Sequence, residues 1–198
     1  MIFSASYVSE PKHPFPVGLN DSWDALVWVS EEGEREIGID PKRIAIMGTS
    51  AGANFAAVLA QRACLASPRI PLVFQPLLVP ALNLNLSTVE RDNGYLFWFI
   101  DLYVPNVHDR TKPEVCPALQ EDKLAFDGMP PTLVSVAELD VLCSEGEMYA
   151  EKLQSHGVPV ISKALKGLPH TGAVADRVCA QVHKYHEDLI EALKQAFA

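Results

Sequence analysis

The strongest constraint on this chain is the pentapeptide Gly48-Thr49-Ser50-Ala51-Gly52. It fits the pattern G-x-S-x-G, in which a serine stands on a sharp turn between a strand and a helix. The apolar residues 43–47 predict a buried strand before the turn, and the Ala- and Leu-rich residues 53–66 predict a helix after it. The pentapeptide alone also fits a tight turn with a helix-capping serine. The flanking strand and helix favour an exposed serine nucleophile, with helix N–H groups close to a developing oxyanion.

The composition is that of an ordinary globular domain. The chain has 198 residues, 48% of them apolar and 21% charged, so we expect a single domain over residues 1–198. The net charge of −9 argues against nucleic acid or an anionic membrane as a partner. No membrane span and no signal peptide are expected, which predicts a soluble, cytoplasmic protein. The scattered cysteines predict reduced thiols; they are Cys64, Cys116, Cys143 and Cys179.

Strand and helix patterns alternate along the chain. Strands are predicted over residues 1–8, 43–47, 70–74, 132–137 and 158–163, and residues 9–19 are expected to form an extended loop. Helices are predicted from residue 20 or 21 to Gly33 or Gly38, and over residues 53–66, 144–156 and 173–197. This alternation predicts an α/β fold, a mostly parallel sheet with helices on both faces. Residues 77–120 lack a clean period, so we expect an irregular segment that lines a pocket.

A serine nucleophile needs a base, and the base needs an acid that orients it. Asp140 follows the strand predicted at 132–137, and His170 follows the strand predicted at 158–163. Both therefore belong at the carboxyl edge of a parallel sheet, together with Ser50. Two alternatives stay open: Glu138 could be the orienting acid, and Asp140 could only cap the next helix.

The other histidines are weaker candidates for the base. His13 and His108 lie in proline-bearing loops, and His156 lies at a predicted helix end. His183 and His186 stand three residues apart on the last predicted helix, where a solvated face is the simpler interpretation. No metal site is expected.

Five motifs resemble those of one family, the hormone-sensitive-lipase-like carboxylesterases of the α/β-hydrolase superfamily. Residues 11–16 are similar to its P-E-H-P-F-P loop, 38–45 to G-I-D-P-x-R-I-A and 48–53 to G-D-S-A-G-G. Residues 139–150 resemble its acid-bearing segment and 157–170 its histidine-bearing segment. The resemblance implies ester hydrolysis through an acyl-enzyme and no cofactor. It also implies roles for three residues: Ser50 as nucleophile, His170 as base and Asp140 as its partner.

The chain also departs from this family. Members begin upstream and carry an H-G-G-G loop that completes the oxyanion hole, and no such motif occurs here. The expectation is therefore an N-terminally truncated hydrolase fold in which the Ala51 N–H is the obvious oxyanion donor. A sheet without the upstream strands would expose an edge and favour a homodimer. Thr49, Ala53, Thr171 and Gly172 replace the residues usual in the family.

The sequence thus predicts a serine hydrolase whose partner is a small-molecule carboxylic ester. The residues expected to line its substrate pocket are Thr49, Tyr95, Phe97, Trp98 and Leu142, although the aromatic ones could equally be core. Two other functions remain open. A repurposed hydrolase could catalyse a rearrangement, dehydration or lactone step, or the fold could be a non-catalytic binding module.

Overall fold

The computed structural model describes residues 12–85 and 94–198, and the side chains of residues 94–97 are not among those described. The helices are α1 (Val17–Ile37), α2 (Ala51–Leu65), α3 (Gly94–Tyr103), α4 (Cys143–Ser155) and α5 (Ala180–Ala196). The strands are β1 (Ile44–Ala45), β2 (Gly48–Thr49), β3 (Leu72–Leu78), β4 (Thr132–Ala137) and β5 (Val160–Leu165). A short 3₁₀ helix, η5 (His170–Val174), precedes α5.

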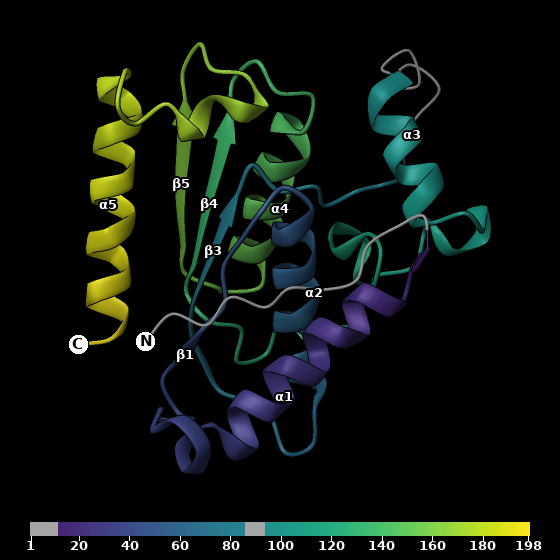
Figure 1. Ribbon diagram of the computed structural model, residues 1–198, viewed down its shortest axis with the longest axis vertical. Coiled ribbons are helices and arrows are strands. Elements are labelled where there is room, and N and C mark those ends of the chain that lie inside the picture. The colour runs from purple at the N-terminus through teal and green to yellow at the C-terminus, as the bar shows by residue number, and fades with distance from the viewer. Residues whose placement is uncertain (1–11, 86–93) are drawn as a thin grey trace.

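The strands form one parallel sheet. Its order is β1-β3-β4-β5, and β2 pairs with the far end of β3. Thr132 at the start of β4 lies between Gln75 of β3 and Val160 of β5, so β3, β4 and β5 run side by side in register. In Figure 1, α2 and α4 lie on one side of this sheet and α5 on the other. The predicted α/β class with helices on both faces is therefore confirmed.

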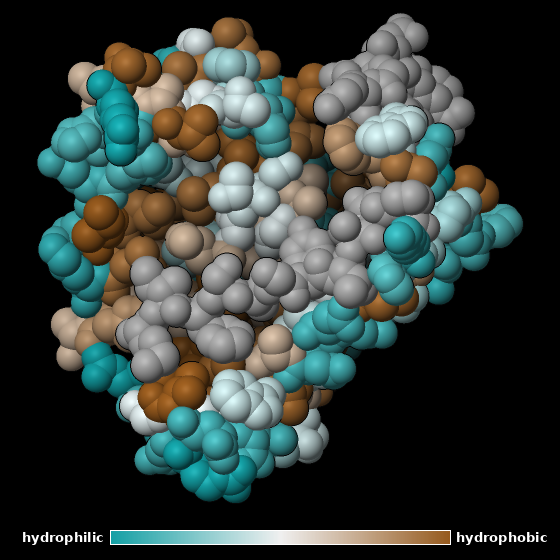
Figure 2. Space-filling model, in the orientation of Figure 1, coloured by the Kyte–Doolittle hydropathy of each residue, from teal (hydrophilic) through white to brown (hydrophobic). Residues whose placement is uncertain are grey.

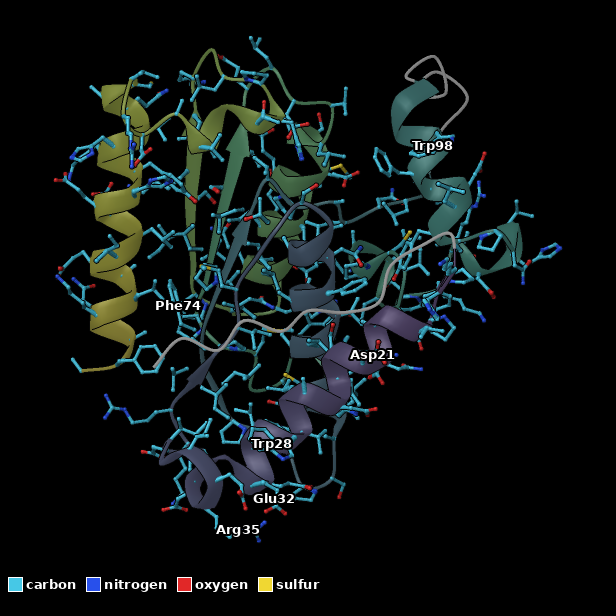
Figure 3. The ribbon with its side chains drawn as sticks, viewed as in Figure 1. Asp21, Trp28, Glu32, Arg35, Phe74 and Trp98 are labelled. Carbon is cyan, nitrogen blue, oxygen red and sulfur yellow. The ribbon has the colours of Figure 1, made fainter. Side chains whose placement is uncertain are left out.

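Two apolar layers hold the helices to the sheet. On one face, small residues of α2 such as Ala53 and Ala57 pack with Leu77, Val136 and Leu153. On the other face, Phe74, Leu133, Tyr185 and Leu189 join the sheet to α5, and Figure 3 labels Phe74 on that side. A third cluster, which includes Leu19, Leu26 and Val58, packs α1 against the outer side of α2.

Within the described part, four strands were predicted and five are found, because a two-residue strand β1 and a separate β2 after it stand where one strand over 43–47 was expected. β4 has the predicted bounds, whereas β5 begins and ends two residues later. Pro76 was expected to end a strand over residues 70–74, yet β3 continues through it to Leu78. The Gln75 N–H donates towards β4, so strand alternation turns position 76 towards β1 and β2. The missing N–H of Pro76 therefore falls in the gap between those two strands, where a proline is tolerated.

Two helix predictions needed correction. α1 begins at Val17 instead of Asn20 or Asp21, because Pro14 and the N-cap residue Pro16 form a turn that leads into it: their carbonyls accept from the N–H groups of Val17 and Asn20. It ends as expected at Gly38, which has φ 69°. The last helix begins at Ala180, seven residues later than predicted, because η5 and a turn occupy the residues that follow His170.

The expectation of an irregular segment over 77–120 is corrected in part. β3 reaches into it, and α3 provides one regular helix. Ile100 and Val104 of this segment pack with Val115 and Leu142 in a fourth apolar cluster. The predicted strand over 1–8 lies outside the described residues.

Charged residues lie on the surface, outside the apolar clusters that join the helices to the sheet. Figure 2 shows hydrophilic residues at the lower tip of the molecule, where α1 ends and Arg35 pairs with Glu32 and Glu36. Of the helices among the described residues, none combines the length and apolar character that crossing a membrane requires.

Candidate active site

Ser50 stands on a strained turn between β2 and α2. Its φ is 55° and its ψ is −117°, a conformation that costs free energy for a residue with a Cβ atom. Its N–H donates to the Leu78 carbonyl at 2.9 Å, and its carbonyl accepts from the N–H groups of Ala53 and Asn54 at 3.0 and 3.1 Å. The Ser50 side chain makes no helix-capping hydrogen bond. The alternative of a merely capping serine therefore does not describe this turn.

The two glycines of the turn differ in what they permit. A Cβ atom at Gly48 would lie 2.1 Å from the Gly52 carbonyl oxygen, so only glycine allows β2 and the start of α2 to approach this closely. A Cβ atom at Gly52 would meet no described heavy atom within 4 Å other than its chain neighbours and the backbone of its own helix. Close backbone approach thus explains Gly48 but not Gly52.

Ser50, His170 and Asp140 form one chain of hydrogen bonds. The Ser50 Oγ lies 2.9 Å from His170 Nε2, and His170 Nδ1 lies 2.6 Å from Asp140 Oδ2. Ser50 follows β2, Asp140 follows β4 and His170 follows β5, so three parallel strands deliver the three side chains to the same edge of the sheet. With Nδ1–H donating to the carboxylate, Nε2 is free to accept the serine proton.

The two acids that compete for His170 have different partners. The Asp140 side chain is 2% exposed, and its second oxygen, Oδ1, accepts from the Leu142 N–H at 3.1 Å. Glu138 instead accepts from the Gly167 N–H at 2.7 Å and pairs with Lys166 at 3.3 Å. Asp140 therefore orients the imidazole, while Glu138 holds the loop that leads to it.

The electrostatics of His170 follow from this partner. The hydrogen bond to the Asp140 carboxylate raises the pKa of His170 above its ordinary value, and partial burial opposes that shift. The imidazole is still 37% exposed, so a ligand can reach it from solvent. The arrangement supports an imidazole that gains a proton readily when the serine releases one.

The other predicted site residues lie in several environments. Ala51 opens α2, and its N–H is one of the first-turn groups that have no acceptor within a helix. Leu142 is buried beside the loop that carries Asp140, and Thr49 is exposed. Trp98 is 56% exposed on α3 (Figure 3), and the side chains of Tyr95 and Phe97 lie outside the described residues. Whether these residues line a substrate pocket stays a prediction.

Two of the other histidines have contacts away from Ser50, and the cysteines are unpaired with one another. His156 stacks on Phe126 with 4.2 Å between ring centroids, and His183 faces Glu187 on α5. All four cysteines are free thiols, and burial raises the pKa of Cys64 and of Cys116 to about 11. In the described ranges, no three His, Cys, Asp or Glu side chains are grouped as metal ligands would be.

Sequence reasoning missed two residues that brace the turn after β3. Asn54 of α2 donates to the Ala81 carbonyl at 2.7 Å, and Glu145 of α4 accepts from the Leu82 N–H at 2.5 Å. The signal for Asn54 was available, because it is a polar residue within an otherwise apolar run of helix. Glu145 gave no such signal, since an acidic residue in a first helical turn is common.

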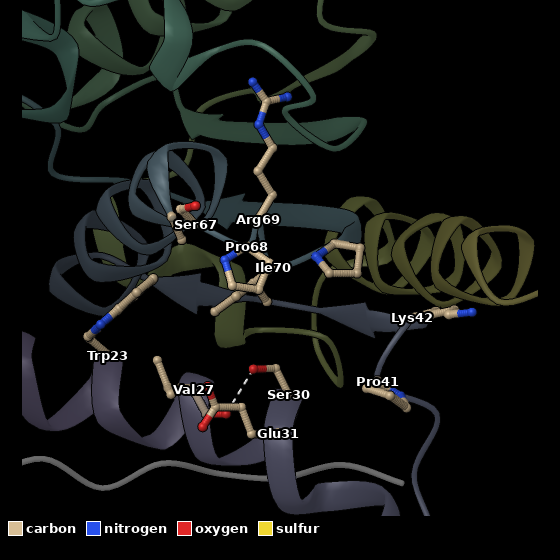
Figure 4. A pocket seen from close by; sticks show the side chains of 12 residues that line it. Trp23, Val27, Ser30, Glu31, Pro41, Lys42, Ser67, Pro68, Arg69 and Ile70 are labelled. Atoms are coloured by element: carbon tan, nitrogen blue, oxygen red, sulfur yellow. Dashed lines mark hydrogen bonds between the residues drawn. The ribbon is translucent and has the colours of Figure 1, made fainter.

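A separate hollow of about 530 Å³ lies between α1 and residues 66–71 (Figure 4). Trp23 and Val27 line one side of it and Pro68 and Ile70 the other. It adjoins the amino end of β3, whereas Ser50 lies at the carboxyl end of the sheet. This hollow is therefore not where a substrate of Ser50 would bind.

Comparison with known proteins places the chain in a family. Residues 1–173 match the family described as alpha/beta hydrolase fold. The chain is 33% identical to an AB hydrolase superfamily protein of Schizosaccharomyces pombe, over 100% of this chain and 61% of that protein. It is 37% identical to carboxylesterase NlhH of Mycobacterium tuberculosis, over 81% of this chain and 52% of NlhH.

A solved structure agrees with these relatives. The hyperthermophilic esterase of the archaeon Pyrobaculum calidifontis superposes with a TM-score of 0.86 at 29% identity, over 96% of this chain and 63% of the esterase. The chain thus spans less than two thirds of the length of the proteins it matches. On its sequence, its sheet and the residues that its strands bring together, the chain belongs to the α/β-hydrolase superfamily, in the hormone-sensitive-lipase-like carboxylesterase branch.

Proposed function

We propose that the protein is a serine hydrolase that cleaves a small carboxylic ester through an acyl-enzyme on Ser50. One observation carries this proposal: His170 lies 2.9 Å from the Ser50 Oγ on one side and 2.6 Å from the Asp140 carboxylate on the other. A hydroxyl, an imidazole and a buried carboxylate in this order are the parts that nucleophilic acyl transfer needs. Relatives named as carboxylesterases support the same reaction.

In the first half of the reaction, Ser50 attacks the ester. Its Oγ bonds to the carbonyl carbon while its proton passes to His170 Nε2. The resulting imidazolium is stabilised by Asp140, and the Ala51 N–H is placed to donate to the oxyanion. When the tetrahedral intermediate collapses, the ester C–O bond breaks and His170 returns the proton to the leaving alkoxide, which departs as an alcohol.

In the second half, water releases the acyl group. His170 removes a proton from the water as its oxygen bonds to the acyl carbon, and the second tetrahedral intermediate then breaks the bond to Ser50 Oγ. The proton returns to the serine oxygen, and a carboxylic acid leaves. Ester and water thus give alcohol and acid, and the chain ends the cycle in its starting state.

The test is turnover of p-nitrophenyl acetate and p-nitrophenyl butyrate by the wild-type chain beside Ser50→Ala. We expect hydrolysis by the wild type, loss of at least about a thousandfold in the variant, and covalent labelling of Ser50 by a fluorophosphonate. A folded, monodisperse wild type that neither turns over nor labels would contradict the proposal and favour the binding module. Labelling of Ser50 without ester turnover would favour the repurposed enzyme instead.

A further inference from the structure

The end of β3 and the turn that follows it form two hydrogen bonds with the backbone of Ser50. The Leu78 carbonyl accepts from the Ser50 N–H at 2.9 Å, and the Ala81 N–H donates to the Ser50 carbonyl at 3.4 Å. Between these two contacts, Val79 has φ 41°, which is rare for a β-branched residue. A backbone in such a conformation persists only where its surroundings hold it. The turn 78–81 therefore needs bracing if it is to keep Ser50 in place.

Asn54 supplies a brace from α2. Its side-chain nitrogen donates to the Ala81 carbonyl at 2.7 Å and to the Val115 carbonyl at 2.8 Å, so both amide hydrogens are used. The backbone N–H of Asn54 donates to the Ser50 carbonyl at 3.1 Å. Ser50, Ala81 and Asn54 thus form a closed ring of hydrogen bonds around the start of α2.

The other end of the same side chain is unsatisfied. Asn54 is 2% exposed, and within the described part of the chain its Oδ1 is buried with no hydrogen-bond partner. A buried acceptor without a donor costs stability. A serine or threonine at this position would not bury an unpaired amide oxygen. However, a hydroxyl donates only one hydrogen bond, so it could not bond to both the Ala81 and the Val115 carbonyl. The side chain therefore serves the geometry of the turn at some cost to the core.

We propose that Asn54 is a positioning residue for the nucleophile. By holding the turn 78–81 against the Ser50 backbone, it sets where Ser50 Oγ lies relative to His170 Nε2. This inference rests on the proposed role of Ser50 as the nucleophile. It predicts that removing the Asn54 amide slows the chemical step while ester binding is preserved.

Gln61 provides a matched control on the same helix. It is also 2% exposed, and its side-chain nitrogen donates to the Pro117 carbonyl at 2.9 Å and to Tyr149 Oη at 3.1 Å. Neither partner belongs to the turn 78–81. Replacing Gln61 removes a buried amide from α2 without touching the ring around Ser50.

The experiment compares Asn54→Ala with Gln61→Ala at a temperature well below both melting points. For Asn54→Ala we expect kcat to fall about ten- to a hundredfold with KM within about twofold, and fluorophosphonate labelling of Ser50 to slow by a similar factor. Gln61→Ala should keep kcat within about twofold at a comparable loss of Tm. Equal losses of kcat in the two variants would overturn the proposal. If Asn54→Ala does not fold, Asn54→Ser, which keeps one donor, takes its place.

Hydrogen exchange gives a readout that does not depend on catalysis. Amides of Ser50 and Ala81 should exchange faster in Asn54→Ala than in the wild type, and should be unchanged in Gln61→Ala. Unchanged exchange at both amides in the Asn54 variant would refute the positioning role. A wild type that neither hydrolyses esters nor labels would refute the proposed function, while the exchange comparison would still decide whether Asn54 holds the turn.

Discussion

The carboxylate of Asp140 uses both of its oxygens to fix His170. Oδ2 lies 2.6 Å from His170 Nδ1, and Oδ1 accepts from the Leu142 N–H at 3.1 Å. Because one oxygen is held by the backbone of its own loop, the carboxylate cannot rotate freely, and it presents the other oxygen to the imidazole. The contact between Asp140 and His170 thus fixes both the orientation of the imidazole ring and the position of its proton on Nδ1.

Asp140→Asn should therefore leave the fold in place and remove most of the activity. The amide can donate to Nδ1, which favours the tautomer with its proton on Nε2, the atom that must accept from Ser50. We expect kcat for p-nitrophenyl acetate to fall by about 10⁴. The measurement is steady-state turnover, with circular dichroism to show that the variant is folded. A loss below about tenfold would show that Asp140 does not orient the base.

Glu138→Gln separates the two candidate acids. The Glu138 carboxylate accepts from the Gly167 N–H at 2.7 Å and pairs with Lys166, whereas His170 is hydrogen-bonded to Asp140, so losing the Glu138 charge should loosen only the loop before the histidine. We expect kcat to fall by no more than about tenfold, far less than for Asp140→Asn. The same turnover assay on both variants makes the comparison. An equal or larger loss in Glu138→Gln would give the orienting role to Glu138.

The pH dependence should report the raised pKa of His170. A protonated imidazole cannot take the serine proton, so kcat/KM should rise as pH rises through the pKa of His170. Since the Asp140 carboxylate raises that pKa, the acid limb should lie above the ordinary imidazole value of about 6.5. The measurement is a pH–rate profile of the wild type.

In Asp140→Asn, the residual activity should have its acid limb at lower pH, because the carboxylate that raised the pKa is gone. An acid limb at the same pH in both proteins would mean that another group titrates.

The sequence was sufficient to predict that Asp140 and His170 lie near Ser50, because strand ends are local features. Asp140 and His170 each follow an apolar run, and a parallel sheet brings such ends to one edge whatever the details of pairing. The same locality explains β4, whose run of apolar residues begins after Pro131 and ends at Glu138. Each of these predictions depended on an apolar run and the polar residues directly after it, a pattern that spans about ten residues.

Features that depend on tertiary contacts could not be predicted in this way. Pro76 reads as a strand end, and only the gap between β1 and β2 makes it acceptable inside β3. The side chain of Asn54 bonds to Ala81 and Val115, which lie 27 and 61 residues further along the chain, and no local sequence pattern predicts such contacts. The choice between Glu138 and Asp140 likewise needed the position of Gly167.

Gly48→Ala and Gly52→Ala test whether close backbone approach shapes the elbow. A Cβ atom at position 48 would lie 2.1 Å from the Gly52 carbonyl oxygen. One at position 52 would meet no described heavy atom within 4 Å beyond its chain neighbours and the backbone of its own helix. We expect Gly48→Ala to lower the free energy of unfolding by at least about 3 kcal/mol, and Gly52→Ala to change it by about 1 kcal/mol or less, because alanine favours helix. Urea denaturation measures both. Similar losses in the two variants would mean that the geometry at Gly48 is not what holds the turn.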